Sequence, residues 1–146
     1  MANSIFFDLN IIIDVLDKNR PRFENSKAAL QKAIEDEFEI AMSSDMLSNF
    51  YYICQKKFNC QNMTNAFVFL KENFVILEFS QDVIQSAIKR YEELCTEGKE
   101  GDFEDLLQIS CAIAGGCALF VSEDKNLKGL ELGIKVLSCD EFLGDV

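Results

Sequence analysis

The chain has 146 residues and is 49% apolar, which is enough to build the core of one domain covering residues 1–146. Its 25 acidic and 14 basic residues give a formal net charge of −11, so it lacks the basic surface usual in nucleic-acid-binding proteins. It has no histidine and no CxxC pair, which argues against a zinc site. It also has no basic leader and no apolar run of about 20 residues, which predicts a cytoplasmic protein.

Short apolar segments alternate with helical patterns along the chain. In chain order, we expect strands at residues 4–7, 38–42, 74–77, 118–121 and 134–137. We expect helices at residues 9–16, 22–36, 46–57, 61–72, 80–95, 102–114 and 140–143, with a loop or short helical turn at 125–133. This alternation predicts a three-layer α/β fold, in which helices flank a mostly parallel central sheet of about four to five strands. Ligands of such sheets bind beyond the carboxyl ends of the strands.

Local patterns indicate how some helices begin and what they bury. The run at residues 43–45, Ser-Ser-Asp, is expected to cap the helix that follows it, and Ser80 is expected to cap the helix at 80–95. Three cysteines fall on apolar helical faces and are expected to be reduced core residues, because a free thiol packs as a small hydrophobe. They are Cys54, Cys95 and Cys111.

Four aspartates follow predicted strands or open a predicted helix, namely Asp8, Asp102, Asp105 and Asp124. Each has a purely local interpretation. Asp8 fits a helix N-cap, Asp102 and Asp105 fit a capping box, and Asp124 fits a turn. The spacing of Asp102 and Asp105 also places both carboxylates on one face of the first helical turn, where the helix dipole favours negative charge.

The four carboxylates would repel one another if the fold brought them to one edge of the sheet, and a divalent cation would remove that repulsion. Carboxylates without histidine suit Mg²⁺ or Mn²⁺. Such an ion activates water and stabilises charge on phosphate, which points to metal-dependent chemistry on phosphate esters. The absence of histidine excludes Ser-His-Asp and Cys-His arrangements, and no GxGxxG or GxxxxGK[ST] loop is present. Asp14 and Glu123 are expected to be solvated surface acids.

The motifs around these aspartates resemble those of the PIN domain family, in particular its toxin-like ribonucleases of the VapC type, over nearly the whole chain. The first is Phe7-Asp8-Leu9-Asn10, an aspartate closing the first strand with a polar residue two positions on. The second is Gly101-Asp102-Phe103-Glu104-Asp105, which matches D-F-x-D. The third is Val121-Ser122-Glu123-Asp124, a strand followed by [ST]-x-[DN], and residues 136–143 are similar to the usual ending.

The resemblance implies a PIN fold, hydrolysis of RNA phosphodiester bonds, and Mg²⁺ or Mn²⁺ as the cofactor. It implies that Asp8, Asp102, Asp105 and Asp124 are the catalytic and metal-binding residues. Asn10 and Ser122 would orient those carboxylates by hydrogen bonds. It also implies a homodimer and, as in the bacterial toxins, a cognate antitoxin that blocks the site.

One position departs from the family pattern. The family usually places a glutamate on the helix after the second strand, and Asn49 occupies that position here. An amide offers a metal ion a carbonyl oxygen but no charge. Asp45 lies one helical turn earlier and would substitute if its side chain pointed inward, although a helix cap is the alternative for it.

Three functions remain open on the sequence. They are a metal-dependent endoribonuclease that acts as a toxin, a PIN-fold binding or regulatory module with weakened or lost catalysis, and another metal-dependent phosphoesterase acting on DNA or small phosphates. The aspartates favour the first, whereas Asn49 and the acidic surface favour the second. Basic residues near the first and third helices are candidates for positioning a phosphate substrate. They are Lys18, Arg20, Arg22, Lys56 and Lys57.

Overall fold

A computed structural model of the protein describes residues 3–128 and 130–144. A five-stranded sheet forms its centre, with the strand order β3-β2-β1-β4-β5 and every pairing parallel. The strands are β1 (Ser4–Phe7), β2 (Glu39–Ser43), β3 (Phe74–Leu77), β4 (Leu119–Val121) and β5 (Lys135–Leu137). The predicted α/β fold with a parallel-rich sheet is therefore confirmed.

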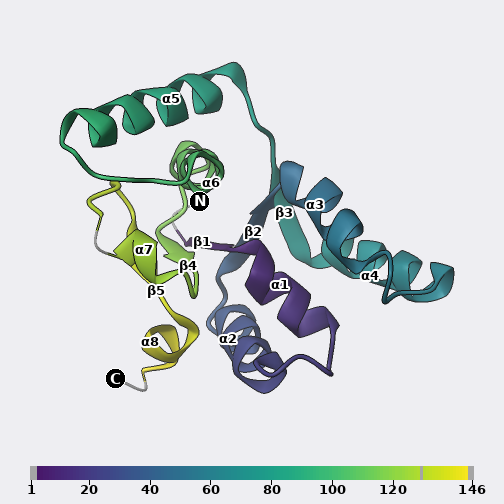
Figure 1. The fold of residues 1–146 in the computed structure, drawn as a ribbon. Helices are drawn as coiled ribbons and strands as arrows, with labels where there is room; N and C mark the ends of the chain where they lie inside the picture. The colour runs from purple at the N-terminus through teal and green to yellow at the C-terminus, as the bar shows by residue number, and fades with distance from the viewer. Residues whose placement is uncertain (1–2, 129, 145–146) are drawn as a thin grey trace.

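Helices cover both faces of this sheet (Figure 1). They are α1 (Leu9–Leu16), α2 (Phe23–Glu35), α3 (Asp45–Cys54), α4 (Cys60–Asn73), α5 (Gln81–Thr96), α6 (Phe103–Ala114), α7 (Lys125–Lys128) and α8 (Cys139–Leu143). The α5 and α6 helices pack together above the sheet in this view, and α1, α2 and α8 lie below it, with α3 and α4 near the β3 edge. No helix in the described ranges is long and apolar enough to cross a membrane.

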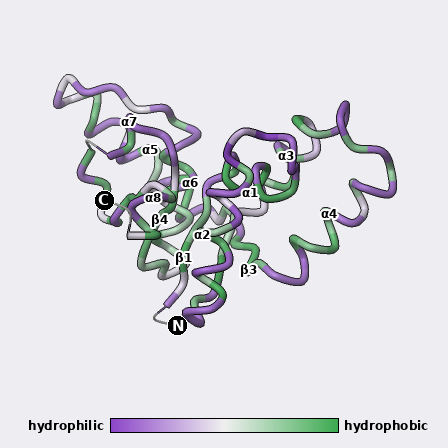
Figure 2. Tube along the Cα trace, turned by 90° about the horizontal axis from the view of Figure 1, so that it is seen from below, coloured by the Kyte–Doolittle hydropathy of each residue, from purple (hydrophilic) through white to green (hydrophobic). Residues whose placement is uncertain are grey.

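The core is centred on β1, whose four residues are all buried. Its Phe6 ring stacks on Phe120 of β4, with ring centroids 5.1 Å apart. Central strands of parallel sheets carry continuous apolar runs because helices bury both of their faces. In Figure 2, hydrophobic colour follows β3 and β4, whereas α4 alternates between hydrophobic and hydrophilic colour. This alternation agrees with the one buried face of α4, which carries Met63, Ala66 and Leu70.

The strand order also decides where a ligand site belongs. After β1 the chain moves outward to β2 and β3, and then returns to the other side of β1 to form β4 and β5. The carboxyl ends of β1 and β4 are therefore neighbours at a point where the order reverses, and such a switch point opens the ligand crevice of an α/β sheet.

Several local expectations are wrong in the structure. Ser43 is the last residue of β2, and Ser44 has helical dihedral angles with no capping hydrogen bond from its side chain, so the expected cap at 43–45 is absent. Cys95 is exposed, because α5 packs only one face against the rest of the molecule, whereas Cys54 and Cys111 are buried as expected. Ser80 does cap α5, since its side chain accepts a hydrogen bond from the Val83 N–H.

Asp14 and Glu123 are not the solvated acids that the sequence suggested. Asp14 is only 5% exposed. Its Oδ1 accepts a hydrogen bond from Arg20 Nε at 2.6 Å, and its Oδ2 accepts one from the Ser26 hydroxyl at 3.0 Å. Glu123 accepts a hydrogen bond from the Cys139 N–H at 2.9 Å and pairs with Arg22 at 3.1 Å. Both acids thus hold the first helices and the last helix in place.

Candidate active site at the carboxyl ends of β1 and β4

Asp8 lies directly beyond β1 and is fixed by three hydrogen bonds. Its backbone N–H donates to the carbonyl of Val121 in β4 at 2.9 Å. Its side chain caps α1, with Oδ1 accepting from the Leu9 N–H at 2.8 Å, while Oδ2 accepts from the Ser122 hydroxyl at 2.8 Å. Burial raises the pKa of Asp8, the hydrogen bonds from Ser122 and Leu9 lower it, and the nearby charge of Asp124 raises it again.

Asp124 follows β4 and faces the same edge. The Ser122 hydroxyl that donates to Asp8 also accepts a hydrogen bond from the Asp124 N–H at 3.0 Å. Asp124 Oδ1 in turn accepts from the Asn126 N–H at 2.9 Å. Asp124 therefore forms the turn that its local sequence predicted. Ser122 links this turn after β4 to the Asp8 carboxylate after β1.

Asp102 and Asp105 enter the site from the N-terminus of α6. Asp102 is the N-cap, and its Oδ1 accepts from the N–H groups of Glu104 at 2.9 Å and Asp105 at 3.3 Å. A reciprocal bond from the Asp105 side chain to the Asp102 N–H is not formed, so the expected capping box is only half present. The Asp105 side chain instead turns toward the other carboxylates.

Asp105 shows how closely the carboxylates are gathered. Its pKa rises from 3.8 to about 7, first because of burial and then because of the negative charges of Asp8, Asp102 and Asp124, with a further rise from its side-chain hydrogen bond to Asp124. An acid that keeps its proton near neutral pH is shielded from water and surrounded by like charge. Four residues that are scattered through the sequence therefore form one electrostatic group.

A cavity of about 630 Å³ opens over this group. Asp102, Asp105 and Asp124 line it, and Asp8 lies outside its lining, held against Ser122. Lys99 and Tyr91 also line the cavity, and neither was singled out from the sequence. Pockets in proteins usually measure roughly 300–1,000 Å³, so the cavity is large enough for a small ligand or one segment of a polymer.

The donor atoms suit a hard divalent cation, because every charged oxygen in the group belongs to a carboxylate. The side chains as they lie do not form a coordination shell. Among residues 3–128 and 130–144, no three His, Cys, Asp or Glu side chains have the arrangement of a metal site. The Asp105–Asp124 hydrogen bond occupies oxygens that ligation would require, so filling the site requires this contact to open.

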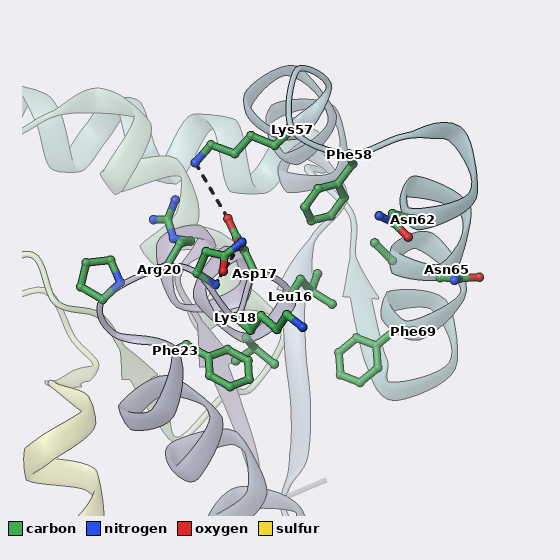
Figure 3. Close-up of a pocket in the computed structure, with 14 residues that line it drawn as sticks. Leu16, Asp17, Lys18, Arg20, Phe23, Lys57, Phe58, Asn62, Asn65 and Phe69 are labelled. Atoms are coloured by element: carbon green, nitrogen blue, oxygen red, sulfur yellow. Dashed lines mark hydrogen bonds and ion pairs between the residues drawn. The ribbon is translucent and has the colours of Figure 1, made fainter.

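The five basic candidates do not line this cavity. Lys18, Arg20 and Lys57 line a separate hollow at the far end of α1 (Figure 3). Arg22 is paired with Glu123, and Lys56 is exposed. The basic residue that lines the cavity over the aspartates is Lys99, whose ammonium group lies 3.3 Å from the Glu97 carboxylate.

A model of the PIN domain matches residues 4–126 of the chain. The chain belongs to the PIN domain family. Ribonuclease VapC1 of Aquifex aeolicus is 30% identical to this PIN domain over 146 residues, which cover 97% of this chain and 94% of that protein. The resemblance expected from the sequence motifs is thus confirmed.

Solved structures agree with this assignment. The structure of VapBC2 from Rickettsia felis bound to a DNA fragment from its promoter contains a chain that matches with a TM-score of 0.71 at 25% identity, over 92% of this chain and 98% of that one. A toxin–antitoxin complex from Klebsiella pneumoniae matches with a TM-score of 0.69 at 19% identity, over 93% and 98% of the two chains. At that identity the second likeness shows the fold alone.

The structure also shows what surrounds Asn49, where this PIN domain departs from the usual glutamate. Its side-chain Nδ2 donates to Asp45 Oδ2 at 3.2 Å and to Glu104 Oε1 at 3.1 Å. Asp45 is thus tied to Asn49 within α3. Glu104, between the two aspartates of the α6 motif, was missed from the sequence because its contact spans 55 residues.

Asn10 and Ser122 were expected to orient the carboxylates. Ser122 has the hydrogen bonds that such a role requires. The Asn10 side chain is exposed, and within the described residues it makes no hydrogen bond to the four aspartates, so its role remains a prediction.

Proposed function

We propose that the protein is a divalent-metal-dependent endoribonuclease that hydrolyses RNA phosphodiester bonds as the toxin of a toxin–antitoxin pair. The observation that carries this proposal is the gathering of Asp8, Asp102, Asp105 and Asp124 at the switch point of the sheet. There, burial and the charges of the other three carboxylates raise the pKa of Asp105 to about 7. The name of the Aquifex relative, Ribonuclease VapC1, supports RNA as the substrate class.

The four aspartates would hold Mg²⁺ or Mn²⁺. When bound, such an ion lowers the pKa of water and offsets negative charge that develops on the phosphate. Asp105 would give up its proton and its hydrogen bond to Asp124 when the site fills, because metal ligands must be ionised. Ser122 would keep Asp8 turned toward the site, since its hydroxyl already donates to Asp8 Oδ2 at 2.8 Å. Lys99 at the cavity wall would favour an anionic substrate.

Two protein partners belong to this proposal. A cognate antitoxin is supported by the likeness to the VapBC2 structure. A homodimer is supported by apolar side chains that α5 exposes beside the cavity, since Ile84, Ile88 and Tyr91 are 40–45% exposed. Phe103, next to Asp102, extends this surface through an edge contact with Tyr91 at 6.0 Å between ring centroids. Exposed apolar patches of this kind mark protein interfaces.

Calorimetric titration of Mn²⁺ into the metal-free protein, with RNA cleavage assayed on the same samples, tests the proposal. We expect the wild type to bind Mn²⁺ and to cut RNA only when the ion is present, and we expect Asp105→Asn to lose both properties. Asp36→Asn is a matched control, because it also neutralises an aspartate, but one that is exposed, pairs with Lys32 on the surface and lies outside the group. Full metal-dependent cleavage by Asp105→Asn would contradict the proposed site.

The alternative function, a PIN-fold binding module with weakened catalysis, is favoured by one observation. Asn49 provides an amide where the family usually has a carboxylate, and this amide is engaged with Asp45 and Glu104. Mn²⁺ binding that is absent in the wild type and appears in Asn49→Glu would support this alternative. The variant should be paired with Glu104→Gln, because a glutamate at 49 would otherwise face the Glu104 carboxylate.

A further inference from the structure

A second hollow, of about 1,140 Å³, lies at the opposite end of α1 from Asp8. One wall is the C-terminal end of α1 and the loop that leads to α2, and the other is the start and middle of α4 (Figure 3). It shares no lining residue with the cavity over the aspartates. Its volume exceeds the roughly 1,000 Å³ of the larger small-molecule pockets, so it suits a segment of a polymer better than a small ligand.

The charge of this hollow is the reverse of the charge of the chain. Three basic residues line it, Lys18, Arg20 and Lys57, against one acid, Asp17, whereas the whole chain has 25 acidic and 14 basic residues. Arg20 is committed to Asp14 at 2.6 Å. Lys57 lies 3.9 Å from Asp17, and Lys18 makes no ion pair within the described residues. Lys18 is therefore available to an anionic ligand, and the exposed Lys57 would exchange its long ion pair with Asp17 for a ligand phosphate.

Aromatic rings stand beside these ammonium groups. Phe58 and Phe69 point into the hollow from the side of α4, and Phe23 faces them from the start of α2 (Figure 3). Phe58 is held edge-on by a ring in α3, at 6.0 Å between centroids, and Phe69 is held edge-on by a ring in β3, at 6.4 Å. The rings are thus fixed in orientation, and each keeps a side toward the hollow.

Amide side chains complete the lining. Asn62 projects from α4 toward the hollow (Figure 3), and its side chain makes no hydrogen bond within the described residues other than the one that its own backbone N–H donates to Asn59. Asn65 lies one turn further along α4, where its Oδ1 accepts a hydrogen bond from Gln61 at 3.0 Å. Cations, aromatic rings and an unengaged amide together are the kind of lining that binds single-stranded nucleic acid, through phosphate contacts, base stacking and base-edge hydrogen bonds.

We propose that this hollow binds a single-stranded segment of the RNA substrate away from the bond that is cut, with phosphates at Lys18 and Lys57 and bases against Phe58 and Phe69. The inference rests on the proposed ribonuclease function. The α1 helix has eight residues and is about 12 Å long. A stacked strand advances roughly 3.4 Å per nucleotide, so about four nucleotides would connect the aspartates to the hollow.

Binding of RNA without cleavage tests the hollow directly. Fluorescence anisotropy of a labelled single-stranded 12-nucleotide RNA would be measured in EDTA at several salt concentrations. The double variant Lys18→Ala/Lys57→Ala should bind more weakly, and the slope of log K against log salt should fall in magnitude by about 1.4, because each single-strand phosphate contact contributes about 0.7. The matched control is Lys71→Ala/Lys89→Ala, two exposed lysines outside the hollow, which should leave binding unchanged.

The stacking contact has its own variant. Phe69→Leu keeps an apolar side chain against Phe74, the β3 ring that contacts it, but removes the aromatic ring. It should weaken RNA binding by about fivefold to 150-fold if a base stacks there. Circular dichroism and a melting curve would verify that the variant folds. Phe58→Leu provides a second position, in case the first substitution disturbs α4. Unchanged affinity in both folded variants would overturn the stacking geometry.

Cleavage assays separate this inference from the function on which it rests. On the 12-nucleotide RNA the lysine double variant should raise KM with little change in kcat, and on a 4-nucleotide RNA it should match the wild type. If the wild type cuts RNA and the double variant behaves like its control on both substrates, the hollow is not an RNA site although the nuclease stands. If the wild type binds the long RNA through these lysines but never cuts it, the nuclease fails and the hollow stands.

A protein partner is the competing occupant. If the hollow variants bind and cut RNA normally but no longer bind a co-encoded protein, the hollow is a protein-docking surface and the RNA inference is overturned. A wild type that neither binds nor cuts RNA overturns both proposals together.

Discussion

Replacing Asp105 with asparagine should stabilise the metal-free protein at alkaline pH. The pKa of Asp105 is about 7 in the fold against 3.8 for a free side chain, so the folded state holds this proton more tightly than the unfolded chain does. The free energy of unfolding should therefore fall as pH rises from about 4 to about 7 and should stay reduced above that. The asparagine side chain has no charge to gain as pH rises, and its amide can still donate to Asp124.

The size of the effect follows from the shift. About three pKa units correspond to roughly 4 kcal/mol at 1.36 kcal/mol per unit. Solvent screens this half-buried side chain, which reduces the expected gain to about 1–2 kcal/mol. For a chain of this length that is a rise in Tm of about 3–6 °C.

Differential scanning calorimetry in EDTA at pH 5 and pH 8 measures this effect directly. The variant should melt above the wild type at pH 8 and by a clearly smaller margin at pH 5. Excess Mn²⁺ at pH 8 should reverse the order, because only the wild type keeps the carboxylate that binds the ion. A variant that melts below the wild type at pH 8 without metal would refute the argument that like charges crowd around Asp105.

Substitutions at three further residues test the surrounding contacts. Asp102→Asn should keep the helix cap while weakening Mn²⁺ binding, whereas Asp102→Ala should also lose about 1 kcal/mol in urea unfolding, because alanine cannot cap. Ser122→Ala should lower the free energy of unfolding by about 1.5–3 kcal/mol and weaken Mn²⁺ binding, because Asp8 loses a charge-assisted hydrogen bond. Unchanged stability would show that water replaces the hydroxyl. Asp14→Ala should lower the free energy of unfolding by about 3 kcal/mol, because Arg20 and Ser26 lose their partner. Its Mn²⁺ affinity should not change.

The sequence was sufficient to predict the elements of the fold and their order. Each predicted strand overlaps an observed strand, and the helices differ at their ends by a few residues, because apolar periodicity is a property of each segment alone. The switch-point location of Asp8 and Asp124 could also be anticipated, since it follows from strand ends in a parallel sheet. These parts of the prediction depend on short-range pattern and on one general rule of topology.

Most failures of prediction concern partners that are supplied from elsewhere in the chain. Asp14 looks like a surface acid until the chain turns and places Arg20 and Ser26 beside it. Glu123 acquires its role only when Cys139 and Arg22 reach it from the two ends of the chain. The run at 43–45 does not cap the helix, because Ser43 pairs with Leu77 of β3 and is therefore part of β2. Local propensity does not contain this information, because tertiary contacts override it.

The contacts of Asn49 change what its substitution means. A glutamate at this position would place a carboxylate beside Glu104, because the Asn49 amide lies 3.1 Å from Glu104 Oε1. It would add negative charge next to Glu104, which directly precedes Asp105, the residue whose pKa burial and neighbouring carboxylates already raise to about 7. With asparagine, the amide donates a hydrogen bond to both Asp45 and Glu104. These two carboxylates are therefore kept, and the repulsion that a third carboxylate at position 49 would cause is avoided. Residues 49 and 104 therefore have to be considered as a pair, and Asn49 by itself is not evidence that catalysis has been lost.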